Sequence, residues 1–297
     1  MRAIVISGGG SKGAFAGGVA QYLIERQKRN YDLFVGTSTG SLLLIHLALN
    51  KIEKLHSVYK EVDANKIFNL NPFFTRKKDG VVQLHINHFN VLRSFARGNK
   101  TFGESKSLRA FLGHHITAFE FESVKQSDKD ILVTVSNLSK NQIEYKSIKD
   151  CSYDDFLDWI WISANYIPFM SLVSKDGFEY ADGGLGSIVS VERAIEAGAT
   201  EIDVIVLRQE NKQRYRLPTT NAFDLMLSLF GFSLDQIEEH NISLGSLRAM
   251  ADGVKLNFIY TPTLLTQNPL LFDKKRMVRW WQRGYLHAQR QFESTSI

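Results

Sequence analysis

The chain has 297 residues, 44% hydrophobic and 23% charged, and this composition excludes a disordered chain and a collagen-like repeat. With a single cysteine, no apolar leader and no run near the roughly 18 apolar residues of a membrane span, we expect a cytoplasmic protein that does not cross a bilayer. The net charge of +5 suits a membrane surface or a nucleic acid, but basic runs as short as 76–78 and 274–276 are usually solvated, so we expect no nucleic-acid partner.

The first fifty residues contain one pattern twice: an apolar strand, a glycine-rich turn and a segment with helical spacing. Such alternation predicts a parallel sheet that is covered by helices. We expect strand 2–7, turn 8–13, helix 14–28, strand 32–35, turn 36–40 and helix 41–50.

Residues 51–115 show a helical pattern with two interruptions and carry several phenylalanines. Apolar residues at helical spacing usually belong to a core, so one interpretation is a helical layer with buried rings. The other interpretation is a lid or an insert that faces the substrate. The rings in question are Phe68, Phe73, Phe74 and Phe95.

The rest of the chain continues the alternation without a long linker or a repeat. We therefore expect one domain over 1–297, with a catalytic core over about 1–210 and an extension over about 211–297. Trp280 and Trp281 in the extension fit either the core or an anchor in a membrane interface. The expected elements are strands 130–137 and 142–148, helix 154–164, strand 178–181, helix 191–197, strand 202–207, helix 222–250, strand 255–260 and helix 273–292.

Ser38 lies at the centre of a G-x-S-x-G pattern between a predicted strand and a predicted helix. A nucleophile in this position sits on a strained turn, so the residues two places away must be small, and Gly36 and Gly40 meet that requirement. The sequence therefore predicts that the Ser38 hydroxyl projects freely as a nucleophile.

The earlier turn, from Gly8 to Gly13, also follows a strand and precedes a helix, and its glycines allow backbone amides to approach a ligand. It matches the G-x-G-x-x-G pattern of dinucleotide sites, but the required acidic residue is misplaced, since Asp32 starts the second strand. It is not a phosphate P-loop either, because Lys12 precedes the last glycine. An oxyanion hole for an ester attacked by Ser38 explains both glycine turns together.

A base for Ser38 has two kinds of candidate. His240 and His287 are the late histidines that an α/β-hydrolase triad would use, but both fall inside predicted helices. Asp182 lies at a strand end, and Gly183 and Gly184 follow it. A carboxylate is a weak base at its usual pKa near 4, so Asp182 needs an environment that raises the pKa or a direct hydrogen bond to Ser38.

Taken in order, the stretches 8–13, 36–40 and 182–184 resemble the patatin-like phospholipase family over about the first 210 residues. Residues 163–168 are similar to the stretch that precedes the D-G-G motif of that family. The chain departs from the family pattern at 185–191, where prolines and asparagines are common. This departure affects the details expected of the substrate pocket.

The resemblance implies a three-layer α/β sandwich with a mostly parallel central sheet, in which Ser38 is the nucleophile and Asp182 is the base without a histidine. It implies that backbone amides of Gly8, Gly9 and Gly10 hold the oxyanion, and that Lys12 and Gly13 position the loop or the substrate. The expected substrate is a phospholipid or another acyl-ester lipid. No metal or cofactor is expected.

Two further points stay open at this stage. Peripheral contact with a membrane surface is compatible with the sequence, and the oligomeric state is unknown. A catalytically silent lipid-binding or interaction protein with the same fold is the alternative to an enzyme.

Overall fold

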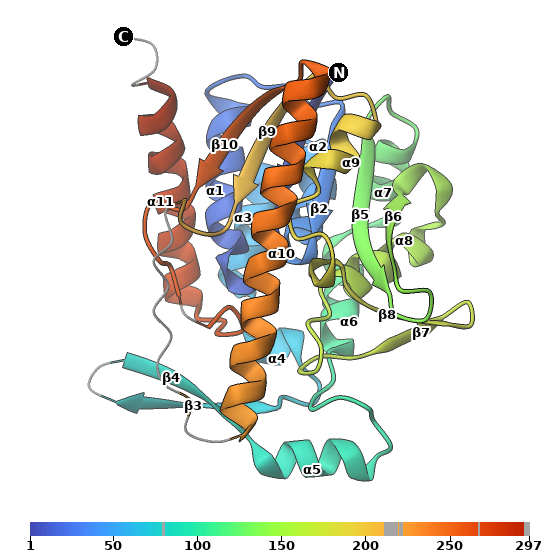
Figure 1. Cartoon of the computed structure of the whole chain (residues 1–297), viewed down its shortest axis with the longest axis vertical. Helices are drawn as coiled ribbons and strands as arrows, with labels where there is room; N and C mark the ends of the chain where they lie inside the picture. Colours follow the sequence, from blue (N-terminus) through green and yellow to red (C-terminus); the bar gives the residue numbers. More distant parts are fainter. Residues whose placement is uncertain (79–80, 211–218, 220–221, 267, 294–297) are drawn as a thin grey trace.

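The structure is a computed structural model that describes residues 1–78, 81–210, 219, 222–266 and 268–293 (Figure 1). An eight-stranded sheet forms the centre, in the order β10-β9-β1-β2-β5-β8-β7, with β6 on the second edge of β5. A separate two-stranded hairpin pairs β3 with β4. The strands are β1 Arg2–Ile6, β2 Leu33–Thr37, β3 Phe73–Lys78, β4 Val81–Ile86, β5 Asp130–Asn137, β6 Gln142–Ser147, β7 Val173–Lys175, β8 Phe178–Asp182, β9 Glu201–Val206 and β10 Lys255–Tyr260.

Helices cover both faces of the sheet. The α-helices are α1 Gly13–Glu25, α2 Leu44–Ala48, α3 Ile52–Glu61, α4 Ala64–Ile67, α5 His88–Ala96, α6 Lys106–His115, α7 Ala118–Lys125, α8 Tyr153–Ser163, α9 Val191–Glu196, α10 Ala222–Asp252 and α11 Lys274–Glu293. Short 3-10 helices are η1 Gly10–Lys12, η2 Ser38–Leu43, η3 Ile148–Asp150 and η4 Gly183–Leu185. Among the described residues, none of these helices is long and apolar enough to cross a membrane.

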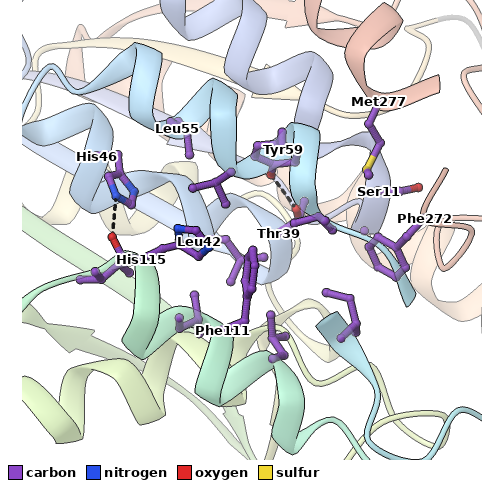
Figure 2. A pocket seen from close by; sticks show the side chains of 17 residues that line it. Ser11, Thr39, Leu42, His46, Leu55, Tyr59, Phe111, His115, Phe272 and Met277 are labelled. Atoms are coloured by element: carbon purple, nitrogen blue, oxygen red, sulfur yellow. Dashed lines mark hydrogen bonds between the residues drawn. The ribbon is translucent and has the colours of Figure 1, made fainter. Parts of the chain in front are cut away.

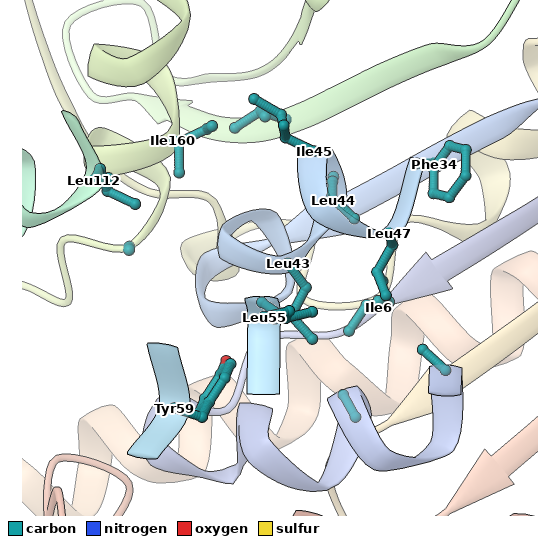
Figure 3. Packing of buried hydrophobic residues seen from close by; sticks show 14 of the residues in the cluster. Ile6, Phe34, Leu43, Leu44, Ile45, Leu47, Leu55, Tyr59, Leu112 and Ile160 are labelled. Carbon is teal, nitrogen blue, oxygen red and sulfur yellow. The ribbon is translucent and has the colours of Figure 1, made fainter. Parts of the chain in front are cut away.

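Strand β1 shows why the sheet is covered on both sides. Its residues alternate between the two faces: Ile4 and Ile6 belong to one buried cluster, and Ala3 and Val5 belong to another. The first cluster also draws on α1, α3, α8 and α11, and the second draws on α9 and α10. Figure 3 shows part of the first cluster, where side chains of η2 and α2 pack between neighbouring helices. The expected α/β sandwich with a mostly parallel central sheet is confirmed.

The register of β5 positions the site. Strand β6 occupies one edge of β5, so β2 and β8 must share the other. The parallel strand β2 ends with Thr37 opposite Thr134, and the antiparallel strand β8 ends with Asp182 opposite Val135. Because Thr134 and Val135 are neighbours, the two strands meet end to end, and the residues at their carboxyl ends come together.

The structure agrees with most expected elements to within a few residues, and β5 and β10 have the expected bounds. Two expectations were wrong. The helical pattern expected over 51–115 is interrupted by the β3–β4 hairpin, and the helix after the second glycine turn begins as the 3-10 helix η2 rather than as an α-helix.

The sequence left open whether several aromatic residues are buried or exposed, and the structure contains both kinds. Phe68 and Phe73 are buried, whereas Phe74 and Phe95 are exposed. Trp280 and Trp281 are buried in the core, and the Trp281 indole donates a hydrogen bond to the Gln21 side chain at 2.8 Å. These tryptophans therefore hold α11 against α1 and do not reach a membrane interface.

Candidate active site

Ser38 follows the last residue of β2 and has a left-handed backbone, with φ of 54°. A non-glycine residue in this region is strained and is held there by its surroundings. A Cβ atom on Gly40 would lie 2.2 Å from the Ile6 carbonyl oxygen, and one on Gly36 would lie 2.7 Å from the Gly40 carbonyl carbon. Both positions therefore require glycine, as we expected from the G-x-S-x-G pattern.

Two other serines fix the backbone of this turn. The Ser38 amide donates to the Ser163 hydroxyl at 2.9 Å, and the Ser41 hydroxyl donates to the Ser38 carbonyl at 2.7 Å. Ser163 is fully buried at the end of α8. The sequence analysis included Ser163 only as part of the stretch 163–168 that is similar to the family. It did not predict this hydrogen bond, because no local sequence pattern marks a buried serine that accepts from a distant amide.

Asp182 is almost completely buried, with 3% of its surface exposed. Its backbone is held on both sides, because its amide donates to the Asn165 carbonyl at 3.1 Å and its carbonyl accepts from the Ser136 hydroxyl at 2.9 Å. The carboxylate oxygen Oδ1 accepts from the Gly184 amide at 2.7 Å. A Cβ atom on Gly183 would lie 2.3 Å from the Thr134 carbonyl oxygen, so only glycine fits at position 183 beside β5.

Burial raises the pKa of Asp182 to about 7, and the Ser38 hydroxyl and the Gly184 amide lower it by a smaller amount. The Ser38 side chain is thus near enough to act on the carboxylate, although it makes no hydrogen bond of ordinary geometry to it. Oδ2 of Asp182 has no hydrogen-bond partner among the described residues. A carboxylate with its pKa near neutrality and one free oxygen is suited to accept a proton.

The glycine loop after β1 lies directly beside Ser38, since a Cβ atom on Gly8 would lie 3.3 Å from the Ser38 Cβ. The Gly8 amide already donates to the Ile188 carbonyl at 3.2 Å. The amides of Gly9 and Gly10, in contrast, make no hydrogen bond to the rest of the described chain. The ammonium group of Lys12 donates to the carbonyl of Leu207, the residue after β9, and this bond ties the loop to the sheet.

Gly13, at the start of α1, sits close to the turn that follows Ser38. A Cβ atom there would lie 2.3 Å from the Thr39 hydroxyl oxygen and 2.4 Å from that of Tyr59. This last glycine of the loop therefore allows α1 and η2 to approach closely, which brings the two glycine turns together.

A buried group of hydroxyls, which the sequence did not single out, joins the two chain segments of the site. The Ser190 hydroxyl lies 2.8 Å from that of Ser187, 3.0 Å from that of Thr134 and 3.3 Å from that of Thr37. Thr37 also donates to the Ser187 carbonyl at 2.9 Å, and the Tyr145 hydroxyl donates to Ser187 at 3.3 Å. The loop after Asp182 is thereby bound to the residue that precedes Ser38.

We expect Ser190→Ala to lower the free energy of unfolding by about 1–3 kcal/mol, because it removes the shared partner of several buried hydroxyls. Urea denaturation measures this loss. Ser123→Ala is the control, since the Ser123 hydroxyl bonds only a carbonyl of its own helix at an exposed site and should leave the midpoint unchanged. Equal midpoints for Ser190→Ala and the parent protein would contradict a structural role for the network.

An apolar cavity of about 50 Å³ begins beside the two glycine turns and runs between η2, α3 and α6 (Figure 2). Its few polar side chains are uncharged: burial lowers the pKa of His46 to about 4 and raises that of Tyr59 to about 12. The cavity therefore suits a hydrocarbon chain better than a polar group. The lining residues are Gly10, Ser11, Thr39, Leu42, His46, Leu55, Val58, Tyr59, Val62, Ile67, Leu108, Phe111, Leu112, His115, Ile116, Phe272 and Met277.

The rival histidines have other surroundings. His240 is exposed on α10, and the ring of His287 lies on α11 at 5.9 Å from the ring of Phe15. No hydrogen bond joins either histidine to Ser38. In the part of the chain that the structure describes, no group of three or more His, Cys, Asp or Glu residues is placed to hold a metal ion.

Comparison with known proteins identifies the family of this α/β fold with its glycine-flanked serine and aspartate. The model of the family described as "Patatin-like phospholipase" matches residues 4–195, which is more than half of the chain. The chain belongs to the patatin-like phospholipase family. Membership supports lipid hydrolase activity in general.

Among solved structures, the chain is similar in fold to VipD from Legionella pneumophila, with a TM-score of 0.50 and 14% sequence identity. The match covers 99% of this chain and 67% of the VipD chain. At this identity the likeness concerns the fold alone. A search of curated proteins found no match.

Proposed function

We propose that this patatin-like protein is a serine-dependent lipid acyl hydrolase of the phospholipase A, lysophospholipase or carboxylesterase type. Ser38 is its nucleophile and Asp182 its general base. The observation that carries the proposal is the end-to-end meeting of β2 and β8 on one edge of β5. This meeting brings a serine with a strained backbone against a buried carboxylate whose pKa is about 7.

In the proposed reaction, Asp182 takes the proton of the Ser38 hydroxyl as the serine oxygen attacks the ester carbonyl. The free amides of Gly9 and Gly10 donate to the oxygen that becomes negative, while the Gly8 amide stays on Ile188 and holds the loop. The tetrahedral intermediate collapses to an acyl-serine, and Asp182 returns the proton to the departing alcohol. Water then attacks the acyl-serine with Asp182 again as base, and the fatty acid is released.

The neutral apolar cavity beside the glycine turns is the proposed site for the first methylenes of the acyl chain, because its volume of about 50 Å³ is too small for a whole chain. Lys12 has a structural part in this proposal, since its ammonium group is bound to the Leu207 carbonyl. A lipid ester is favoured over a small polar ester because transfer of a hydrocarbon chain from water into the cavity contributes roughly 0.8 kcal/mol for each buried methylene.

A fluorophosphonate probe tests the proposal directly. It phosphonylates an activated serine, so mass spectrometry of the digested protein should find the label on Ser38 after incubation at neutral pH. A panel of phospholipid, lysophospholipid and aryl ester substrates then defines the preferred ester. Folded protein that neither takes the label nor releases fatty acid from any of these esters would favour a silent lipid-binding protein with the same fold.

The proposed oxyanion loop gives a second measurable result. A Cβ atom on Gly9 would lie 2.7 Å from the Leu207 Cδ1 atom and 2.8 Å from its Cβ, so Gly9→Ala must displace the loop. We expect kcat to fall by about 10²–10³, the effect of losing one oxyanion donor. Gly113→Ala is the matched control, because its Cβ would have no neighbour nearer than 3.6 Å. Full activity of a folded Gly9→Ala protein would remove the loop from the mechanism.

A further inference from the structure

One segment of the protein, residues 64–103, is strongly basic. Residues 64–103 contain seven Lys and Arg residues and one acidic residue, Asp79, a formal net charge of +6. A second basic stretch, residues 274–292, holds six Lys and Arg residues and no acidic residue. The segment 64–103 includes the β3–β4 hairpin and α5, which lie together at one end of the molecule (Figure 1).

The same segment exposes large apolar side chains. On α5, Phe89 is 74% exposed, Leu92 67% and Phe95 47%. Phe74 of β3 is 38% exposed, and the Arg76 guanidinium lies 5.3 Å from the centre of its ring. Such a surface is costly in water, because each exposed ring and chain could bury apolar area against a partner.

This surface is connected to the candidate active site. Figure 1 shows β5 and β9 pointing toward the end of the molecule where the hairpin and α5 lie, so β2, which is parallel to β5, carries Ser38 toward the same end. A row of aromatic rings leads inward from α5. The distance between ring centres is 6.0 Å from Phe95 to Phe102 and 5.8 Å from Phe102 to Phe169. It is 5.9 Å from Phe169 to Tyr166. Tyr166 follows Asn165, whose carbonyl accepts the Asp182 amide.

We propose that the β3–β4 hairpin and α5 form a docking face for the surface of an anionic phospholipid bilayer. The rings and leucine enter the boundary between head groups and acyl chains, and the basic side chains around them, Arg76, Lys77, Arg93 and Arg97, meet the lipid phosphates. Exposed rings together with an excess of positive charge favour a membrane over a nucleic acid. A nucleic-acid backbone would bind the basic side chains but would not bury the exposed side chains of Phe89 and Leu92 on α5. Docking here directs the end of the sheet that carries Ser38 toward the lipid.

Vesicle sedimentation with the full chain tests the docking face. The Ser38→Ala protein serves as parent, so that hydrolysis does not alter the vesicles, which contain phosphatidylcholine alone or mixed with phosphatidylglycerol. We expect binding to the mixed vesicles only, and we expect both Phe89→Ser/Leu92→Ser and Arg93→Glu/Arg97→Glu to weaken it about tenfold or more. Leu244→Ser/Leu247→Ser is the control, since these leucines are also exposed, at 50% and 63%, and belong to the C-terminal half of α10, whose end lies far from α5 (Figure 1).

Activity distinguishes this proposal from the proposed function. With Ser38 intact, the docking variants should keep full turnover of a soluble short-chain aryl ester and lose turnover of phosphatidylglycerol in vesicles. Failure of the parent to bind the mixed vesicles overturns the docking face and leaves a protein partner as the occupant. Loss of binding in the α10 control to the same extent as in the α5 variants also overturns it. Neither result bears on the labelling of Ser38.

Discussion

Replacing Ser38 by alanine should reduce kcat/KM for an aryl acyl ester by about 10⁴-fold or more, the effect seen when the nucleophile of a serine hydrolase is removed. No other described hydroxyl both adjoins the glycine loop and faces the Asp182 carboxylate. Continuous assay of the released alcohol measures the loss, and circular dichroism establishes that the variant is folded.

The matched control is Ser57→Ala on α3, because the Ser57 hydroxyl is exposed and bonds only the Lys54 carbonyl. It should retain the parent activity and the parent labelling by a fluorophosphonate. Turnover by Ser38→Ala at more than a few per cent of the parent rate would mean that another group attacks the ester.

Asp182→Asn should also remove activity, by about 10³–10⁴-fold, because an amide cannot accept the Ser38 proton. The asparagine keeps the size of the side chain, and its oxygen can still accept from the Gly184 amide, as Asp182 Oδ1 does at 2.7 Å. The loss is therefore expected in kcat, with KM nearly unchanged. His240→Ala and His287→Ala are the controls, and full activity in both supports a base other than histidine.

The raised pKa of Asp182 also predicts a pH dependence. Since a base works only when deprotonated, kcat/KM should rise about tenfold per pH unit up to the pKa of about 7 and level off above it. A profile that instead follows a group with an ordinary carboxyl pKa near 4 would contradict the assignment.

Stability should change with pH in the opposite direction. The folded state favours the protonated form of Asp182, so this contribution to the unfolding free energy is complete below about pH 4 and is lost as the pH rises through about 7. Asp182→Asn cannot ionise, and at about pH 8 it should be more stable than the parent by up to about 4 kcal/mol. Urea denaturation at several pH values checks this, and the difference should shrink toward acid pH.

The fold and the candidate residues Ser38 and Asp182 could be predicted from the sequence because each depends on a pattern of neighbouring residues. Each strand, glycine turn and helix near Ser38 follows from the order of apolar and glycine residues over a few positions. The need for glycine at 36 is local, because a Cβ atom there would meet the backbone of Gly40, whereas the need at 40 comes from the carbonyl of Ile6 on the neighbouring strand β1. The roles of Ser38 and Asp182 in catalysis stay predictions.

The parts that the sequence did not predict depend on contacts between distant segments. Ser190 and Thr37 are ordinary polar residues until the segment between Asp182 and α9 packs against the ends of β2 and β5. The β3–β4 hairpin was missed although the sequence carries Asp79-Gly80, a dipeptide that favours hairpins. The helical interpretation of residues 51–115 as a whole passed over this signal.

The single domain expected over 1–297 also stays a prediction, which two observations support. Strand β10 extends the same sheet beyond β9 over six paired residues. On α11, a Cβ atom on Gly284 would lie 2.1 Å from the Phe15 carbonyl oxygen, so this helix packs closely on α1. The extension is thus in contact with the N-terminal half of the chain.

The end-to-end meeting of β2 and β8 has a consequence for how the chain acquires its activity during folding. Strands β1 and β2 lie close in sequence and can pair early, but β8 reaches the site only after β5 has joined the sheet. Because long loops close slowly and at an entropic cost, we expect Asp182 to reach the Ser38 turn late in folding. A partly folded chain can therefore already hold the Ser38 turn while the Asp182 carboxylate is not yet beside it.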